Sequence, residues 1–494
     1  MIISPDRKDI ATILNHLGQL VLGLAGFMFI PLCVAVMRKE INPLIDFTIG
    51  VLFAIAVGAF LILAFPAKRP VSWIHSFFTV SFGWMLFSLI GAVPLFLSGH
   101  FASFIDAWFE AMSGFATTGL TLANDLDHMS YAHNMWRHLT MFIGGQGIIL
   151  ASLSIITKAK AAVIGFYIGE GRDERILPNV IATSRFIWKV SFFYMLLGIT
   201  VYTGILLYKG LYIERAVYHA IWLFFASFDT GGFAPQSQNI AYYHSFLLES
   251  ATAVFMILGA MNFNLHFWIW TKKKTELFKN FEIKTFLFTF FILLCLIYIP
   301  LKNMAISEMF RKGFYQLISA HTGCGFANID SFEIMGFPAL SLISLIFAMM
   351  IGGAVCSTTG AIKLMRVGII FKTFLMEIKR WMMPASAVYN DTFHHLQDIS
   401  LSNDKIKSAY LYTGMFVTVY ILGAIIGMFY GYDPLMALFE SVSATANVGL
   451  SVGITQPSMP VGMKILYIFQ MWAGRLEFLS IFVSIGLILS WAKK

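Results

Sequence analysis

The sequence predicts an all-α integral membrane protein built from four pseudo-symmetric repeats that follow two extra transmembrane helices. Three observations support this fold class. The 494 residues are 58% hydrophobic and only 12% charged, and their mean hydropathy is +0.76. Apolar runs of about 20 residues, long enough to cross a hydrocarbon layer of roughly 30 Å, recur along the whole chain. Four shorter segments, each ending in a turn that contains glycine, are similar to one another.

Composition also narrows the class of protein. The formal net charge of +8 does not call for a nucleic-acid partner, and we expect none, because Lys and Arg accumulate on the cytoplasmic loops of membrane proteins. The N-terminal sequence has no cleavable signal pattern, so the first apolar run is expected to remain as a helix. The cysteines lie in apolar stretches without metal-ligand spacing, and disulfides are not expected: Cys33, Cys295, Cys324 and Cys356.

Ten apolar runs are expected to span the membrane. They cover residues 11–37, 45–66, 71–98, 134–157, 184–208, 241–271, 284–302, 337–375 (interrupted), 407–431 and 461–491. Lys and Arg concentrate on one set of the connecting loops, including the run at 272–274. The positive-inside rule makes these loops cytoplasmic, together with both termini.

Four apolar stretches are too short to cross the membrane. They lie near residues 104–118, 216–231, 309–323 and 434–447, and each ends in a glycine-containing turn. Irregular backbone at membrane depth is tolerated only where it lines a cavity or is buried in protein. We therefore expect re-entrant half-helices at these four places.

The half-helices belong to a fourfold internal repeat. AWFEAMSGFATTGLT (107–121) and ALFESVSATANVGLS (437–451) align without a gap, and segments 220–234 and 313–327 align with both. Each unit continues into a spanning helix that carries a further glycine about 25 to 27 residues on: Gly144, Gly259, Gly352 and Gly474. The predicted organisation is an N-terminal pair of helices (1–70) and repeats at 71–160, 183–274, 283–380 and 405–494.

Four such units around one axis would form a cation pore. The C-terminal ends of the half-helices carry partial negative charge, which favours a cation at their meeting point. The turns that follow can direct backbone carbonyls inward to replace the hydration shell of an ion. Alternatively, each glycine simply ends a helix, but four copies at a common offset favour the pore.

The motifs resemble the Trk/Ktr/HKT superfamily of potassium transporters over nearly the whole chain. Matching features include Gly144-Gly145-Gln146-Gly147, the stretch at 352–366 and AGRLE at 473–477. The filter-like turns are Thr117, Thr118, Gly119; Thr230, Gly231, Gly232; Gly323, Cys324, Gly325; and Asn447, Val448, Gly449. The resemblance implies that the transported ion, K⁺, is bound by the backbone carbonyls of Thr118, Gly231, Cys324 and Val448.

The two extra N-terminal spans make the chain similar to TrkH-type pore-forming subunits rather than to the shorter KtrB type. That resemblance implies a homodimer with one pore per subunit in the cytoplasmic (inner) membrane. It also implies a cytosolic nucleotide-binding regulatory ring of the TrkA type and no organic cofactor. Three residues depart from the usual filter pattern, namely Asp229, His321 and Cys324, whereas the four filter glycines resemble the potassium-selective pattern.

A gate is expected below the filter. The stretch 352–363 is rich in Gly, Ser and Thr inside an apolar span, which frees backbone groups and favours a position lining the cavity. It resembles the intramembrane loop of the family; the alternative is a helix-packing seam of small residues. The gate candidates are Gly352, Gly353, Ser357, Thr358, Thr359, Gly360 and Arg475.

Charged residues near these motifs have simpler expected roles. A charge at membrane depth costs at least a few kcal/mol, so Arg475 should face the pore, pair with Glu477, or both. We expect Lys363 to snorkel to the cytoplasmic side. Glu110 and Glu440, near the starts of half-helices, are expected to brace the filter.

The sequence gives different degrees of support to three other functions. An enzyme lacks support because no nucleotide loop, HExxH motif or nucleophile elbow is present, and His394-His395 is expected to lie in a charged cytoplasmic loop. A secondary transporter usually shows two related halves rather than four short repeats. A sodium-permeable, or potassium- and sodium-coupled, uptake protein of the same fold remains the alternative. The aromatic residues Trp222, Phe224 and Phe225 are expected to pack or to face lipid.

Overall fold

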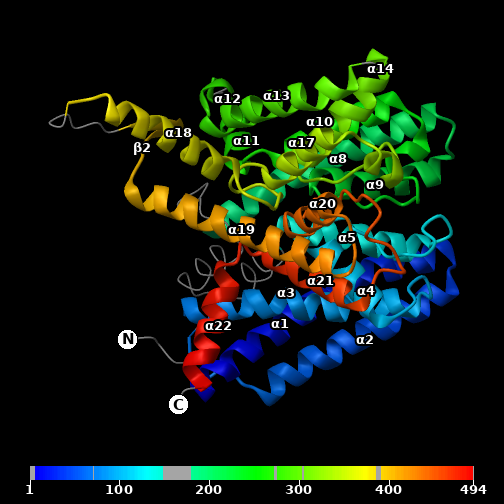
Figure 1. Ribbon diagram of the computed structural model, residues 1–494. Coiled ribbons are helices and arrows are strands. Elements are labelled where there is room, and N and C mark those ends of the chain that lie inside the picture. The colour runs from blue at the N-terminus through cyan, green and yellow to red at the C-terminus, as the bar shows by residue number, and fades with distance from the viewer. Residues whose placement is uncertain are drawn as a thin grey trace.

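The computed structural model describes residues 6–70, 72–147, 180–271, 275–302, 305–384 and 391–492. The chain is an all-helical membrane protein, as predicted (Figure 1). The helices before the middle of the chain are α1 (Arg7–Arg38), α2 (Ile41–Ala64), α3 (Trp73–Leu97), α4 (Phe104–Phe115), α5 (Tyr131–Gln146), α8 (Val180–Tyr208), α9 (Ile213–Phe228), η1 (Asn239–Tyr243), α10 (Phe246–Ala260), α11 (Phe263–Trp270) and α12 (Glu276–Lys279).

The second half of the chain continues the same pattern. Its elements are α13 (Phe281–Leu301), α14 (Ile306–Met309), η2 (Phe310–Phe314), α15 (Tyr315–His321), α16 (Ser331–Met335), α17 (Ala339–Met350), α18 (Leu364–Trp381), β1 (Thr392–His395), β2 (Gln397–Ser400), α19 (Asn403–Phe429), α20 (Pro434–Thr445), α21 (Val461–Arg475) and α22 (Leu479–Ala492). Four times, a long helix is followed by a short helix that ends in a turn and then by another helix: α3–α4–α5, α8–α9–α10, α13–α15–α17 and α19–α20–α21.

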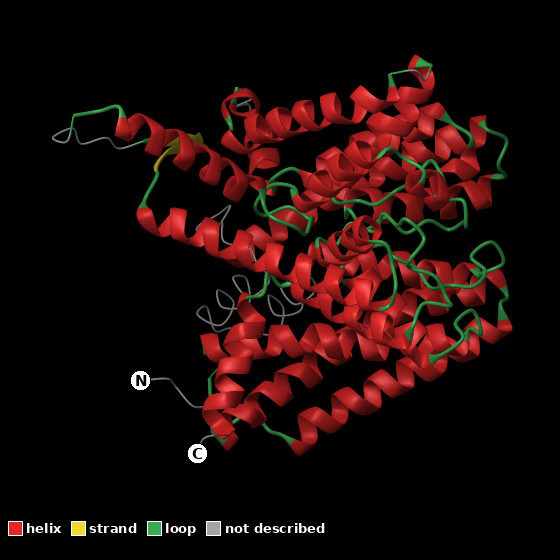
Figure 2. Ribbon diagram, in the orientation of Figure 1, coloured by secondary structure: helices red, strands yellow, loops and turns green. Residues whose placement is uncertain are grey.

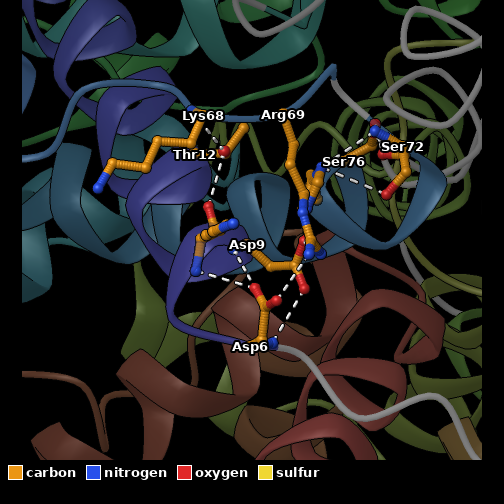
Figure 3. A network of polar contacts seen from close by, with 9 residues as sticks. Asp6, Asp9, Thr12, Lys68, Arg69, Ser72 and Ser76 are labelled. Atoms are coloured by element: carbon orange, nitrogen blue, oxygen red, sulfur yellow. Dashed lines mark hydrogen bonds and ion pairs between the residues drawn. The ribbon is translucent and has the colours of Figure 1, made fainter.

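The first two helices form an antiparallel pair, and polar contacts fix the N-terminal end of α1. Asp6 caps α1 by accepting hydrogen bonds from the backbone N–H groups of Lys8 and Asp9 (2.9 and 3.0 Å). Arg69, in the loop between α2 and α3, binds the carboxylates of Asp6 and Asp9 at 2.7 and 2.8 Å (Figure 3). These contacts tie the start of α1 to the loop that leads into the first repeat.

Six described helices are long and apolar enough to cross a membrane, and two bent helix pairs could each add one span. The prediction of continuous spans at 241–271 and 461–491 is wrong. The pair α10–α11 bends by 100° and the pair α21–α22 by 106°. The first bend arises because Asn262 caps a new helix by accepting from the N–H of Asn264 (2.8 Å). At the second, Glu477 and Phe478 adopt left-handed backbone conformations (φ 48° and 64°).

The predicted spans that form the second helices of the third and first repeats are also interrupted, or continue outside the described part of the chain. The expected break in 337–375 is present, because residues 351–363 separate α17 from α18. Helix α5 ends at Gln146, and Gly147 takes a left-handed conformation (φ 76°); the remainder of the predicted span 134–157, from residue 148, lies outside the described residues. Each of the four repeats therefore has a break in, or an end to, its second helix.

A short β-hairpin replaces part of the expected cytoplasmic loop. Strands β1 and β2 pair in antiparallel fashion, with His394 opposite Asp398 (Figure 2). Phe393 is buried and packs against Phe281 of α13, with the rings tilted by 36° and their centroids 4.8 Å apart. Among the described residues, no group of His, Cys, Asp and Glu side chains could hold a metal ion.

Candidate functional site

Four turns with the same backbone path follow the four short helices. We call them the filter turns: residues 117–119, 230–232, 323–325 and 447–449. In each turn the first residue has a positive φ, at Thr117 (54°), Thr230 (50°), Gly323 (67°) and Asn447 (56°). The third residue is a glycine that also has a positive φ: Gly119 (92°), Gly232 (74°), Gly325 (83°) and Gly449 (95°). Glycine suits this third position because it adopts left-handed conformations without steric cost.

The middle residue of every filter turn is held by the helix before it. Its backbone N–H donates to a carbonyl five residues earlier: Thr118 to Ser113 (2.8 Å), Gly231 to Ala226 (2.8 Å), Cys324 to Ser319 (3.0 Å) and Val448 to Ser443 (2.9 Å). In the first and fourth turns the glycine N–H also donates to the hydroxyl of Ser113 or Ser443, at 3.1 and 3.0 Å. Each turn is therefore a fixed extension of its half-helix.

The four filter turns close into a ring. A Cβ added to Gly119, Gly232, Gly325 or Gly449 would overlap the carbonyl oxygen of Gly231, Cys324, Val448 or Thr118, respectively. Each glycine thus lies against the middle carbonyl of the next repeat, in the cyclic order first, second, third, fourth and first again. The structure brings together all twelve filter residues that the sequence singled out.

A cavity lies at one mouth of the ring. Its volume is about 180 Å³, and residues of all four repeats line it, among them Gly119, Asn239, Gly325 and Gly449. Residues Thr121, Ser237, Ser451 and Thr455 also line it. The cavity therefore opens onto the filter glycines of three repeats.

Two buried carboxylates brace the filter rather than line it. Glu110 accepts hydrogen bonds from the Thr121 hydroxyl and the Leu122 N–H, both at 3.0 Å. It also pairs with the buried Arg137 at 2.7 Å, and Arg137 in turn donates to the carbonyl of Ala234, which follows the second filter turn (3.3 Å). Glu110 therefore links the first half-helix to the residues that follow its own filter turn. Through Arg137 it also links this half-helix to the second repeat.

Glu440 braces the fourth repeat in the same way, through hydroxyl and backbone N–H donors. It accepts from the N–H of Val452 at 3.0 Å and from the hydroxyl of Thr455 at 2.8 Å. The equivalent position in the third repeat is Gln316, which donates to Asn328 at 2.7 Å. In the second repeat it is Leu223, so the bracing differs from repeat to repeat.

A loop lies directly beneath the ring. We call residues 351–363 the gate loop; its ends are joined by a parallel bridge between Ile351 and Ile362. The Thr358 hydroxyl lies 3.1 Å from that of Thr230 and donates to the Gly259 carbonyl at 3.0 Å. A Cβ on Gly360 would overlap the carbonyl oxygen of Ala446, just before the fourth filter turn.

The remaining gate-loop candidates tie the loop to itself and to the third turn. Gly352 donates to the Ile362 carbonyl at 2.9 Å, and Gly353 donates to the Thr359 hydroxyl at 3.0 Å. Ser357 and Thr359 hydroxyls are 2.9 Å apart. The side chain of Thr359 lies 3.7 Å from where a Cβ on Gly323 would be.

Arg475 completes the contacts below the ring. Its guanidinium donates to the Thr358 carbonyl (2.7 Å), to the Thr117 hydroxyl (3.2 Å) and to the Gly144 carbonyl (2.6 Å). Together, the gate loop and Arg475 contact or adjoin the first residue of every filter turn. A fixed positive charge thus lies between the first filter turn, the gate loop and α5.

The neighbouring charges form a buried cluster, and one expectation about them needs revision. Glu477 pairs with Arg366 at 2.5 Å and with Lys363 at 3.9 Å. The snorkelling expected of Lys363 is wrong: its side chain is buried and its ammonium donates to the carbonyl of Thr359 at 2.5 Å. The break before α18 leaves this carbonyl without a helical partner, and Lys363 supplies one.

The three residues that depart from the family pattern have side chains bound to neighbouring helices. Asp229 accepts from the Gln146 amide at 2.6 Å. His321 lies 2.8 Å from the hydroxyl of Thr289, and the Cys324 thiol donates to the Ala226 carbonyl at 3.4 Å. Trp222, Phe224 and Phe225 are all buried, so they pack inside the protein.

Sequence reasoning missed two charged residues that hold this site together. Arg137 was not singled out in the sequence, although it is buried and pairs with Glu110. Glu282 lies just before the predicted span 284–302 and accepts a hydrogen bond from the Val355 N–H of the gate loop at 2.7 Å. A carboxylate at the edge of an apolar span was the available signal, but its partner is 73 residues away.

Comparison with known proteins agrees with this architecture. The family model of TrkH, a cation transport protein, matches residues 44–490. An uncharacterised cation transporter of Methanocaldococcus jannaschii is 31% identical over 97% of this chain and 95% of its own length. The Trk system potassium uptake protein TrkG of Escherichia coli is 27% identical over 96% of this chain and 97% of its own.

A solved structure has the same fold. The potassium transporter TrkH from Vibrio parahaemolyticus superimposes with a TM-score of 0.81 at 22% sequence identity, covering 96% of this chain and 98% of that one. Family membership makes the protein a multi-pass membrane transporter for cations and not an enzyme. The chain belongs to the TrkH family of cation transport proteins.

Proposed function

We propose that this protein takes up potassium across the cytoplasmic membrane through the ring of filter turns. The observation that carries the proposal is the cyclic contact of four glycines with four carbonyl oxygens. An ion at the centre would exchange its hydration shell for the carbonyls of Thr118, Gly231, Cys324 and Val448. The four half-helices direct their partially negative C-terminal ends towards the same place.

Potassium is favoured over sodium by two lines of support. All four filter glycines are present, and any side chain there would displace a carbonyl of the neighbouring turn. Relatives that align over nearly the whole chain are named potassium uptake proteins. The membrane potential would drive the ion inward with roughly 2.3 kcal/mol per elementary charge per 100 mV.

The gate loop and Arg475 close the inner end in this proposal. Opening requires the loop to leave Thr230 and the fourth turn, and Arg475 to release Thr117. A cytosolic nucleotide-binding ring of the TrkA type would bias this movement, and the working unit would be a homodimer with both termini cytoplasmic. The basic residues on the predicted cytoplasmic loops supply a docking surface for such a partner.

Flux into liposomes tests the proposal. We would compare wild type with a variant lacking residues 355–360, in potassium and in sodium gradients and without any partner protein. The expected result is low flux for wild type and rapid, potassium-selective flux for the deletion. Equal potassium and sodium flux through the deletion variant would favour a sodium-permeable protein, and unchanged low flux would show that the loop is not the gate.

A further inference from the structure

Glu282 is a buried carboxylate that neither the filter nor its bracing uses. It is the second residue of α13, whose start is capped by Asn280: the Asn280 side chain accepts from the N–H groups of Glu282 and Ile283 at 2.9 and 3.4 Å. Only 1% of Glu282 is exposed. A carboxylate is favoured at a helix N-terminus by the helix dipole, but that alone does not require its burial.

The carboxylate binds the gate loop and the bend of the second repeat together. One oxygen accepts from the N–H of Val355 at 2.7 Å, and the other accepts from the Asn262 amide at 3.3 Å. The next residue of the loop, Cys356, accepts through its carbonyl from the N–H of Phe263 (3.2 Å). Hydrogen bonds to an ionised acceptor are stronger than neutral ones, so Glu282 is a principal anchor of this end of the loop.

The cytoplasmic hairpin packs against the same carboxylate. His395 of β1 is buried, and its Nδ1 lies 3.8 Å from the second Glu282 oxygen and 3.3 Å from the Asn280 amide nitrogen. The contact of the Phe393 ring with the Phe281 ring holds the hairpin against the start of α13. The opposite strand presents Gln397, Asp398 and Ser400 to solvent.

The hairpin is also continuous with the gate loop along the chain. Helix α18 begins at Leu364, whose N–H donates to the Gly353 carbonyl of the loop at 3.0 Å, and β1 follows α18. In Figure 1 the hairpin lies at the end of the molecule that also carries the N- and C-termini. A force on the hairpin therefore acts on the loop along two routes, through α18 and through Glu282.

From these contacts we propose that Glu282 is a positioning residue that holds the gate loop closed, and that the hairpin at 392–400 controls it through His395. The inference rests on the proposed gating function of the loop. Displacement of the hairpin by a cytoplasmic partner would withdraw His395, loosen Glu282 from Val355 and Asn262, and free the loop on the side away from the filter. The contacts of Thr358 and Arg475 on the filter side would then break in a second step.

The native Cys356 provides a direct readout, because it lies in the gate loop and is only 2% exposed. Full-length protein in liposomes would be treated from the cytoplasmic side with a small cationic thiol reagent, and modification of the Cys356 peptide would be followed by mass spectrometry. Variants Glu282→Ala and His395→Ala would be compared with His394→Ala. The last is a matched control: it lies on the same hairpin but bonds to Asp398 and Glu276 instead of Glu282.

We expect Cys356 to react about tenfold faster in Glu282→Ala than in wild type, as for the loss of one charge-assisted hydrogen bond. His395→Ala should give a smaller increase, and His394→Ala, which loosens the hairpin at Glu276 but leaves His395 beside Glu282, the smallest. Wild-type reactivity of Cys356 in Glu282→Ala, alongside open flux in the 355–360 deletion, would overturn this inference while leaving the gate intact. Low flux in the deletion would instead overturn the proposed gating role of the loop, on which this inference rests.

The buried filter thiol of Cys324 reports on folding in the same experiment. If Cys324 reacts together with Cys356 in Glu282→Ala, that variant has lost its structure and the decision passes to His395→Ala. Faster reaction at Cys356 alone in His395→Ala would then support the inference, and an unchanged rate would overturn it.

Discussion

The ring of filter turns and the layer just beneath it are built from the same four repeats, yet only the ring is symmetric. All four turns share two left-handed residues and the same backbone hydrogen bond. In the layer beneath, Gly144, Gly259 and Gly474 press against the last carbonyl of the preceding half-helix, whereas Gly352 presses against Gly360 of its own loop. In the third repeat, the gate loop takes the place of the packing contact between the second helix and the half-helix.

The difference shows what each layer requires. A dehydrated ion needs equivalent ligands on all sides, so every repeat must keep the same turn. In the proposed function the gate loop moves, while the second helices of the other three repeats, packed tightly against their half-helices, form a fixed frame. Symmetry is therefore expected to be strict in the ring and absent in the gate.

Breaking the ring should have the largest effect. Gly449→Ala places a methyl group on the Thr118 carbonyl and forces alanine into a left-handed conformation (φ 95°), a strain of about 1 to 3 kcal/mol before any clash. We expect potassium-selective flux to be abolished or its selectivity lost, measured in liposomes that contain the 355–360 deletion as the open background.

Gly453→Ala separates strain from overlap in this test. Gly453 has a similar φ of 96°, but nothing lies within 4 Å of its Cβ position. It should keep selective flux. Equal loss in both variants would mean that turn strain, and not the carbonyl contact, limits conduction.

The bracing carboxylates should differ in importance although they occupy equivalent positions. Glu110→Gln leaves the buried Arg137 without its ion-pair partner, which typically destabilises a protein by about 3 to 5 kcal/mol. Glu440→Gln removes hydrogen bonds to hydroxyl and backbone N–H groups and should cost about 1 to 3 kcal/mol. Thermal unfolding in detergent, followed by intrinsic fluorescence, should rank Glu110→Gln as the less stable; the reverse order would contradict the contacts described.

Removing the charge beneath the ring should open the gate in part. Arg475→Ala deletes three hydrogen bonds that join the gate loop, the first turn and α5. Because one such bond to a charged group contributes about 1.5 to 3 kcal/mol, partner-free flux should rise roughly tenfold or more. Arg475→Lys keeps the charge but not the forked geometry, so its flux should lie between the two. No increase in either variant would remove Arg475 from the gate.

The smallest expected effect is a pH dependence of the hairpin's stability that the filter turns do not share. Hydrogen bonds to Asp398 and to Glu276 raise the pKa of His394 above its ordinary value of 6.5. Because the folded pKa is raised, this attachment is fully present below pH 6.5 and is lost as the pH increases through the raised pKa. Hydrogen exchange of residues 392–400, corrected for intrinsic rates, should therefore speed up modestly above neutral pH. The dependence should vanish in His394→Gln, while the filter turns show none.

Local signals explain which features the sequence could predict. The glycines of the filter turns, the short length of the half-helices and the Gly-, Ser- and Thr-rich stretch at 352–363 are all visible within a few residues. The fold class and the family followed from them. The positions of the filter residues in one closed ring were expected, although their ion-binding role remains a prediction.

Features that depend on distant contacts could not be predicted. The bends after α10 and α21 lie within long, mainly apolar runs, and their causes are the cap at Asn262 and the left-handed Glu477 and Phe478. Because a charge at membrane depth is costly, the sequence predicts Lys363 at the membrane edge. The carbonyl that binds its ammonium is brought into position only when the loop has folded. The hydrogen bond from the Val355 N–H to Glu282 joins two segments of the third repeat that are 73 residues apart, and it has no local pattern.

The most direct test of the central claim is to locate the ion. Crystals grown with Rb⁺ in place of K⁺ should show an anomalous diffraction peak at the centre of the ring, surrounded by the carbonyl oxygens of Thr118, Gly231, Cys324 and Val448. The peak should weaken when excess K⁺ is added and should persist in excess Na⁺. Absence of a peak in the ring, with Rb⁺ bound elsewhere in the protein, would contradict the account.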